Sequence, residues 1–177
     1  MNRRTAVRNI VIISAGASFI PACTSSTGEA SIHLKNIPLS GSQENMLAAL
    51  TETIVPRTSN FVGAKDLKCH EFVLTMMDDC ASPDDQKTFS EGMKAFEERC
   101  KNKFNNSFVK CTPPQKTELL NAMESAQDGN DSAAKFYKTV KRYTIQDFTS
   151  SKDYLLNVKK WKLIPGPDFK GCVAVKA

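Results

Sequence analysis

The chain has 177 residues, of which 41% are hydrophobic and 24% are charged. This length and composition are those of one globular domain and exclude a disordered or fibrous chain. The formal charge is +5, but residues 1–22 hold three arginines and no acidic residue, so the rest has 21 basic and 19 acidic residues, or +2. A basic nucleic-acid surface is not indicated, and no nucleic acid is expected as a partner.

Residues 1–22 have the pattern of a signal peptide. A basic start is followed by the apolar run 10–20, which is shorter than the roughly 20 residues that a bilayer span needs. The pair Arg3-Arg4, followed by two apolar residues and a further base, resembles a twin-arginine export signal. An ordinary secretory leader is the alternative. Either route predicts a protein of the periplasm or cell envelope, and the twin-arginine route carries cargo that is already folded.

The leader ends at a cysteine. The residues Ile20-Pro21-Ala22-Cys23, followed by a polar stretch, resemble a lipoprotein processing site, where the thiol forms a thioether to diacylglycerol. Lipidation of Cys23 would anchor the chain to a membrane. Cleavage nearby by an ordinary signal peptidase, with Cys23 incidental, is the alternative. Residues 23–41 are interpreted as a tether and residues 42–177 as the folded domain.

Apolar residues at helical spacing predict about five helices in the folded domain. The first helix begins at the cap Ser42 and stops at Pro56, and the second covers 69–80. The third begins at Ser82-Pro83 and ends near Phe104, and the fourth runs from Thr112 to a break at 129–131. The fifth covers 131–148 and is capped by Asp131 or Ser132. No alternating β-pattern is present. The sequence therefore predicts an all-α fold, a single compact helical bundle with an irregular C-terminal arm.

Motifs for cofactors and catalysis are missing from the sequence. No two glycines lie two residues apart, which excludes a dinucleotide fingerprint and a P-loop, and there is no C-x-x-C-H for covalent haem. His70, beside Cys69, is interpreted as a partly exposed histidine at a helix start. A small hydrolase or metalloenzyme built on acidic residues and Cys69/His70 is an alternative. We expect no catalytic, cofactor-binding or metal-binding residue in this chain.

Six cysteines are many for a reduced cytosolic protein and suit an exported one. If Cys23 carries lipid, five remain and at most two internal disulfides form. Cys69 and Cys80 are expected roughly 16 Å apart on one helix, too far for a disulfide. Cys69–Cys100 is the first choice, since the ends of an antiparallel helix hairpin would meet, and Cys100–Cys111 is the rival. A third alternative leaves all thiols free. The disulfide candidates are Cys69, Cys100, Cys111 and Cys172.

Three segments together resemble a known family. LAALTETIVPRTSNFVGAKDLKCHEFV (47–73) has a helix ending in Ile-x-Pro, a short loop with Gly-Ala-x-Asp, and a helix opening toward Glu-Phe. KFYKTVKRYTIQDFTSS (135–151) resembles an aromatic helix leading to Thr-Ser. IPGPDFKGC (164–172) resembles a Pro-Gly…Gly-Cys ending, one residue longer than the usual form. With the leader, these segments resemble gluconate 2-dehydrogenase subunit 3.

The resemblance implies a non-catalytic role. In this family the small subunit pairs with a large flavoprotein of the glucose-methanol-choline (GMC) oxidoreductase type that holds FAD and the sugar or polyol substrate. The small subunit supplies the export signal and stabilises its partner, and a cytochrome c subunit can accept the electrons. Such a chain is an accessory subunit that escorts the enzyme. A stand-alone periplasmic lipoprotein binding module is the alternative.

Large aromatic residues carry much of the energy of protein interfaces, so residues near the C-terminal arm are the interface candidates. These candidates are Phe148, Trp161, Pro165, Gly166 and Phe169. Burial of the same side chains in the local core is the alternative.

Overall fold

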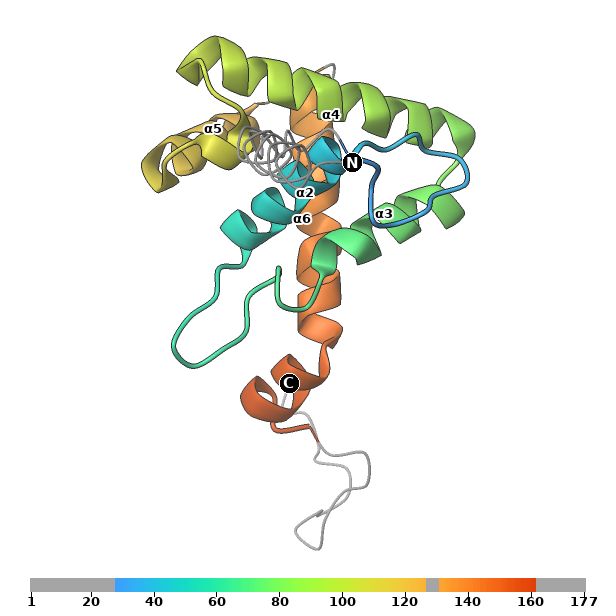
Figure 1. The fold of residues 1–177 in the computed structure, drawn as a ribbon. Helices are drawn as coiled ribbons and strands as arrows, with labels where there is room; N and C mark the ends of the chain where they lie inside the picture. Colours follow the sequence, from blue (N-terminus) through green and yellow to red (C-terminus); the bar gives the residue numbers. More distant parts are fainter. Residues whose placement is uncertain (1–27, 127–130, 162–177) are drawn as a thin grey trace, which may run out of the picture.

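The computed structural model describes residues 28–126 and 131–161. In these residues the chain forms five α-helices and two short helical turns (Figure 1). The α-helices are α2 (Gly41–Ile54), α3 (Cys69–Asp79), α4 (Pro83–Phe104), α5 (Pro113–Ser125) and α6 (Ser132–Ser150); the turns are the 3-10 turn η1 (Phe108–Lys110) and the π-helical turn η2 (Tyr154–Val158). The described residues contain no strand beyond one isolated bridge between Glu29 and Ser40. The all-α prediction is confirmed.

Local capping explains where the helices begin. Ser82 accepts a hydrogen bond from the Asp85 amide (3.2 Å) and Asp131 accepts one from the Ala134 amide (3.1 Å), as the sequence predicts. The predicted cap of the first helix is wrong by two residues. Ser40 is the cap, because the side-chain oxygen of Gln43, three residues later, accepts a hydrogen bond from the Ser40 amide (2.9 Å), which completes a capping box.

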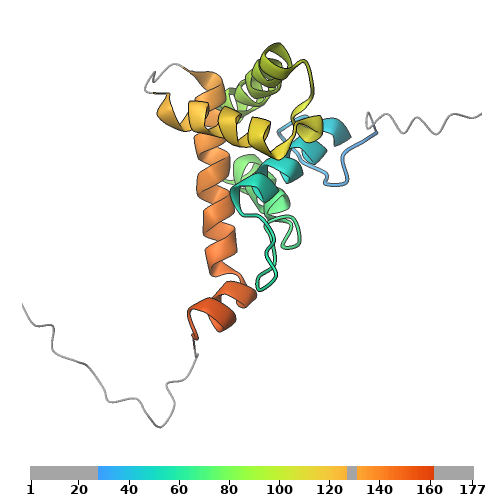
Figure 2. The ribbon, with the colours of Figure 1, turned by 90° about the vertical axis from the view of Figure 1, so that its left-hand side faces the viewer.

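α6 is the axis of the fold and packs against α2, α3, α4 and α5 (Figures 1 and 2). Its closest neighbour is α4, where Phe136 contacts Phe89 and Phe96 with ring centroids 5.0 and 5.6 Å apart. Gly92 permits this approach, since a Cβ there would lie 2.6 Å from the Ser132 carbonyl oxygen. The bundle is therefore fixed by an aromatic cluster at the α4–α6 crossing.

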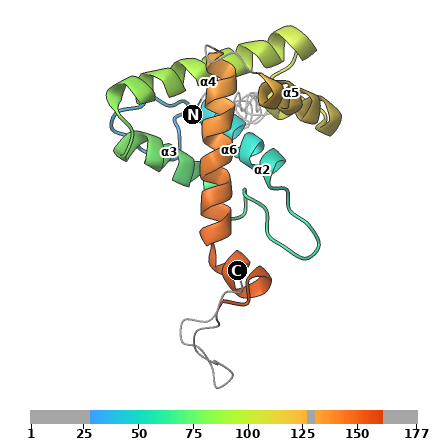
Figure 3. The ribbon, with the colours of Figure 1, turned by 180° about the vertical axis from the view of Figure 1, so that it is seen from behind.

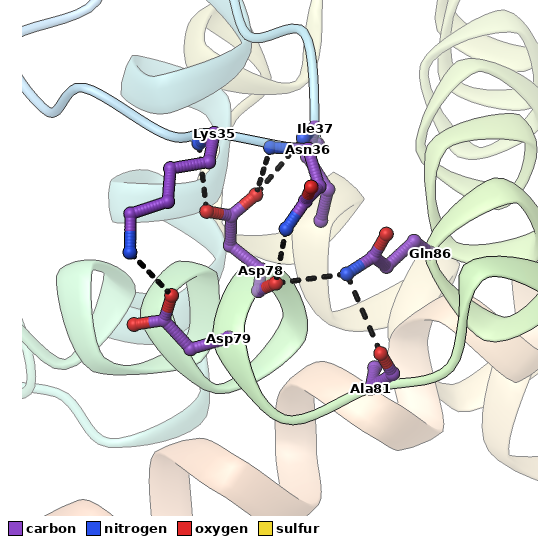
Figure 4. A network of polar contacts seen from close by, with 7 residues as sticks. All are labelled: Lys35, Asn36, Ile37, Asp78, Asp79, Ala81 and Gln86. Carbon is purple, nitrogen blue, oxygen red and sulfur yellow. Dashed lines mark hydrogen bonds and ion pairs between the residues drawn. The ribbon is translucent and has the colours of Figure 1, made fainter.

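The segment 28–40, part of the predicted tether, packs against the helices. Asp78, near the end of α3, is 4% exposed and accepts hydrogen bonds from the amides of Lys35 (2.8 Å), Asn36 (2.8 Å) and Ile37 (2.9 Å) (Figure 4). Burial acts to raise the pKa of Asp78, but the three amide donors outweigh it and hold the pKa below its usual value. Ile37 is buried in the core. One carboxylate thus fastens the N-terminal segment to the bundle.

The arm after α6 begins with a further helical turn. The Ser151 hydroxyl accepts from the Tyr154 amide (3.2 Å), η2 follows, and the Trp161 amide donates to the Leu155 carbonyl (2.9 Å). The arm is therefore helical over Tyr154–Val158, where the sequence predicts irregular chain. Among the described residues, no helix is both long and apolar enough to cross a membrane.

Candidate partner-binding surface

Large apolar side chains are exposed where the loop after α2 meets η2. Phe61 in the loop, and Leu156, Val158 and Trp161 in and after η2, are each between 41% and 50% exposed. We call these four residues the loop–η2 surface. The loop and η2 lie together at the end of the molecule opposite α4 (Figures 1 and 3). Apolar side chains concentrated in this way are typical of interaction sites.

The loop is held in one conformation by the carboxylate of Glu52. One oxygen accepts from the Arg57 amide and the other from the Lys65 amide, both at 2.9 Å, so the two ends of the loop are joined. The Ala64 amide donates to the Val55 carbonyl (2.9 Å) and adds a third link. Glycine is needed at position 63, because a Cβ there would lie 2.6 Å from both the backbone nitrogen of Arg57 and a carboxylate oxygen of Glu52.

Further bonds order the loop tip. Asp66 accepts from the Gly63 amide (3.0 Å) and pairs with the Arg57 guanidinium (3.2 Å). The Thr58 hydroxyl accepts from the Phe61 amide (3.1 Å). The exposed phenyl ring of Phe61 is therefore presented by a loop that is already ordered, which lowers the entropy cost of binding a partner.

Aromatic packing supports the η2 side of the surface. The rings of Phe148 and Tyr154 lie 5.5 Å apart, and both residues are half-buried. A small hollow of about 60 Å³ lies between the loop tip and η2, and Phe61, Phe148 and Tyr154 are among its lining residues. The loop tip and η2 therefore meet at this hollow.

The structure places two of the predicted interface residues on or beside this surface. Trp161 is exposed on it, and Phe148 lies beneath it. Pro165, Gly166 and Phe169 lie outside the described residues, as do Arg3, Arg4, Cys23 and Cys172. Sequence reasoning missed Phe61, Leu156 and Val158. The available signal for Phe61 was an apolar Phe-Val pair within an otherwise polar loop.

The preferred disulfide, Cys69–Cys100, does not match the structure. The sulfur of Cys100 lies 3.3 Å from that of Cys111, whereas the Cys69 thiol is buried beside Asp147 of α6. Burial, reinforced by Asp147, raises the pKa of Cys69 to about 12. The predicted pairing fails because the two helices differ in length: α4 has 22 residues and α3 has 11. Cys69 is the first residue of the short helix, and Cys100, near the end of the long one, lies too far along α4 to reach it.

His70 and Cys69 contact different partners. His70 Nε2 lies 4.0 Å from Oε1 of Glu44, and the other carboxylate oxygen of Glu44, Oε2, accepts a hydrogen bond from the Ser31 amide (2.6 Å). Burial lowers the pKa of His70. Within residues 28–126 and 131–161, no three His, Cys, Asp or Glu side chains are grouped to share a metal ion.

Two larger hollows lie elsewhere and are open to solvent. One of about 460 Å³ lies beside α2 and α4 and has a mostly polar and charged lining. Another of about 490 Å³ lies between the α3–α4 turn and α6, where Lys135, Lys138 and Arg142 border it. Pockets for small molecules are usually enclosed, which neither hollow is.

The fold and the loop–η2 surface define a class of protein: a small helical subunit with an ordered apolar face at one end. The family model of gluconate 2-dehydrogenase subunit 3 matches residues 41–166, and the chain belongs to this family. Membership implies a subunit of a dehydrogenase complex. Comparisons with curated proteins and with solved structures found no match. The matched range contains every α-helix described above and all four residues of the loop–η2 surface.

Proposed function

We propose that this chain is a non-catalytic accessory subunit of a flavin-dependent sugar or polyol dehydrogenase. It binds a large GMC-type subunit that carries FAD, stabilises it and escorts it through twin-arginine export. The paired arginines Arg3 and Arg4 supply the export signal, and lipid on Cys23 tethers the complex to the cell envelope. A cytochrome c subunit then receives the electrons.

The observation that carries the proposal is the ordered, exposed loop–η2 surface in a member of a dehydrogenase-subunit family. The four large apolar side chains of the loop–η2 surface are exposed to water, whereas other aromatic side chains, such as Phe89 and Phe136, are buried in the core. Covering them with a partner removes apolar surface from water, which favours association. The aromatic side chains Phe61 and Trp161 are of the kind that dominates binding energy.

The position of the N-terminal segment supports a combined role in export and binding. Asp78 fixes residues 35–37 beside α3, and this segment lies well away from η2 in all three views (Figures 1–3). A leader or lipid anchor joined to that segment leaves the loop–η2 surface free for the large subunit. Export and binding therefore use separate parts of the chain.

Co-purification from the native host tests the proposal. The tagged wild-type chain is expected to retain a flavoprotein, detected by flavin absorbance and by mass spectrometry. The double variant Phe61→Asp/Leu156→Asp is expected to lose it. Val109→Asp is the matched control, because Val109 is 47% exposed but lies on η1, which packs against α2 and α4.

A wild-type chain that never retains a flavoprotein would refute the proposal. If that chain were instead a monomer with a small ligand of its own, the stand-alone periplasmic lipoprotein binding module would be the better interpretation. Equal loss of the flavoprotein in Val109→Asp would assign the effect to general destabilisation rather than to the surface.

A further inference from the structure

Two buried thiols face each other at the end of α4. Cys100 lies in the last turns of the helix, and Cys111 follows η1 directly. Their sulfur atoms are 3.3 Å apart, and the side chains are 0% and 5% exposed. A disulfide needs the sulfurs at about 2 Å, so a shift of about 1 Å by side-chain rotation closes the gap. We propose that Cys100 and Cys111 form an intramolecular disulfide in the exported protein.

The fold itself brings the two thiols together. α4 ends at Asn105, whose backbone is left-handed (φ 52°) and whose amide donates to the Lys101 carbonyl (2.8 Å). The chain then reverses through η1, and Phe108 packs against Phe96 with ring centroids 5.2 Å apart. Because the reversal and this aromatic contact already hold Cys111 over the helix, this backbone accommodates the closed disulfide.

The local chemistry favours a disulfide over a metal site. Cys100 and Cys111 are a pair, and no group of three or more metal-ligating side chains occurs among the described residues around them. Burial, reinforced by the neighbouring thiol, raises the pKa of Cys100 to about 12. Cys100 is therefore expected to react only when η1 opens, since the thiolate is the attacking species.

Formation of the bond requires an oxidant, which we take to be the disulfide of a thiol oxidoreductase outside the cytoplasm. One thiolate attacks that disulfide and releases one thiol of the oxidant. The second thiolate then attacks the mixed disulfide, closes the Cys100–Cys111 bond and releases the second thiol. The pair loses two protons and two electrons, and the oxidant takes them up. The oxidising compartment is the part of this inference that depends on the proposed export.

The disulfide would link η1 covalently to α4. η1 also packs against α2, so the cross-link holds three elements together after the chain leaves the cytoplasm. The cysteines are eleven residues apart, and closing such a loop restricts the unfolded chain. A protein held in this way resists unfolding more strongly when oxidised than when reduced.

Alkylation followed by mass spectrometry tests the proposal. The mature chain is isolated from the cell envelope, unfolded in N-ethylmaleimide without reductant and cleaved after glutamate. The fragment between Glu98 and Glu118 contains both cysteines. It is expected to be unlabelled and two hydrogens lighter than the dithiol form, and to take two labels after reduction. Cys69, equally buried but without a thiol neighbour among the residues that the structure describes, is the matched control and is expected to be labelled without reduction.

Two labels on the fragment before reduction would overturn the proposal. Refolding the reduced chain with oxidised glutathione separates this outcome from a failure of export. A free pair after refolding overturns the disulfide, whereas a bond formed there by a chain that stays in the cytoplasm supports the disulfide and overturns the export. Reductant should also lower the Tm of the wild type and leave that of Cys100→Ser/Cys111→Ser unchanged.

Discussion

Replacing Asp78 by asparagine is expected to loosen the N-terminal segment and destabilise the fold. The Asp78 carboxylate accepts hydrogen bonds from the amides of Lys35, Asn36 and Ile37, and only the bond from Ile37 is buried. Hydrogen bonds to a charged group contribute about 1.5–3 kcal/mol when buried and less when partly exposed to water. Asparagine turns an N–H donor toward at least one of these amides. The expected loss in the free energy of unfolding is about 2–4 kcal/mol.

The same carboxylate makes the effect depend on pH. The pKa of Asp78 is lower in the folded protein than in the unfolded chain, where it is about 3.9. Its contribution is therefore complete above the unfolded pKa and is lost as the pH falls through the folded pKa. The stability difference between wild type and Asp78→Asn should be constant above about pH 5 and should shrink on acidification.

Urea unfolding and limited trypsin digestion measure these effects. Asp79→Asn is the matched control, because Asp79 is exposed and pairs only with the Lys35 ammonium at 3.4 Å, a contact of about 0–1 kcal/mol. Asp78→Asn should also accelerate trypsin cleavage after Lys35. If the two variants unfold within about 1 kcal/mol of each other, and Lys35 is cleaved at equal rates, the proposed fastening of the segment is refuted.

Three further substitutions test other parts of the structure. Gly92→Ala should lower the free energy of unfolding by about 1–3 kcal/mol, because the added Cβ meets the Ser132 carbonyl at 2.6 Å; an unchanged Tm would contradict that close approach. Phe96→Ala should cost about 3–5 kcal/mol in urea unfolding, since it removes a fully buried ring, and a loss below about 1 kcal/mol would refute its place in the core. Gly63→Ala should reduce flavoprotein retention while the bundle keeps its far-ultraviolet circular dichroism; full retention would show that the loop conformation does not matter for binding.

Helix positions were largely predictable from the sequence because their signals are local. The Ser82-Pro83 start and the cap of the last helix depend only on neighbouring residues. The first prediction is confirmed, and of the two caps predicted for the last helix, Asp131 or Ser132, the structure has Asp131. The error at Ser42 has a local cause as well. Two serines, Ser40 and Ser42, were available as caps, and only Ser40 has a glutamine three residues later to complete the capping box.

Contacts between distant segments were not predictable from the same signals. No local sequence signal marks the role of Asp78, because its partners lie more than 40 residues earlier. The pairing of Cys69 with Cys100 failed because it assumed two helices of matched length. Which pair meets depends on the crossing of α3 and α4 and on the reversal through η1.

The loop explains one part of the family resemblance in physical terms. In Gly63-Ala64-Lys65-Asp66, the glycine leaves room for the Glu52 carboxylate, the buried alanine bonds Val55, and the aspartate accepts from the glycine amide. The motif therefore encodes the shape of the loop that presents Phe61. Exposure of Phe61 itself could not be read from the motif, because it depends on where η2 lies.

The most direct test of the central claim is size-exclusion chromatography with light scattering on the tagged chain solubilised from native membranes. The wild type and Val109→Asp are expected to elute with a larger flavoprotein, and Phe61→Asp/Leu156→Asp is expected to elute alone without flavin absorbance. A wild-type chain that elutes as a flavin-free monomer, or a double variant that keeps its flavoprotein, would contradict the assignment of this surface to a dehydrogenase partner.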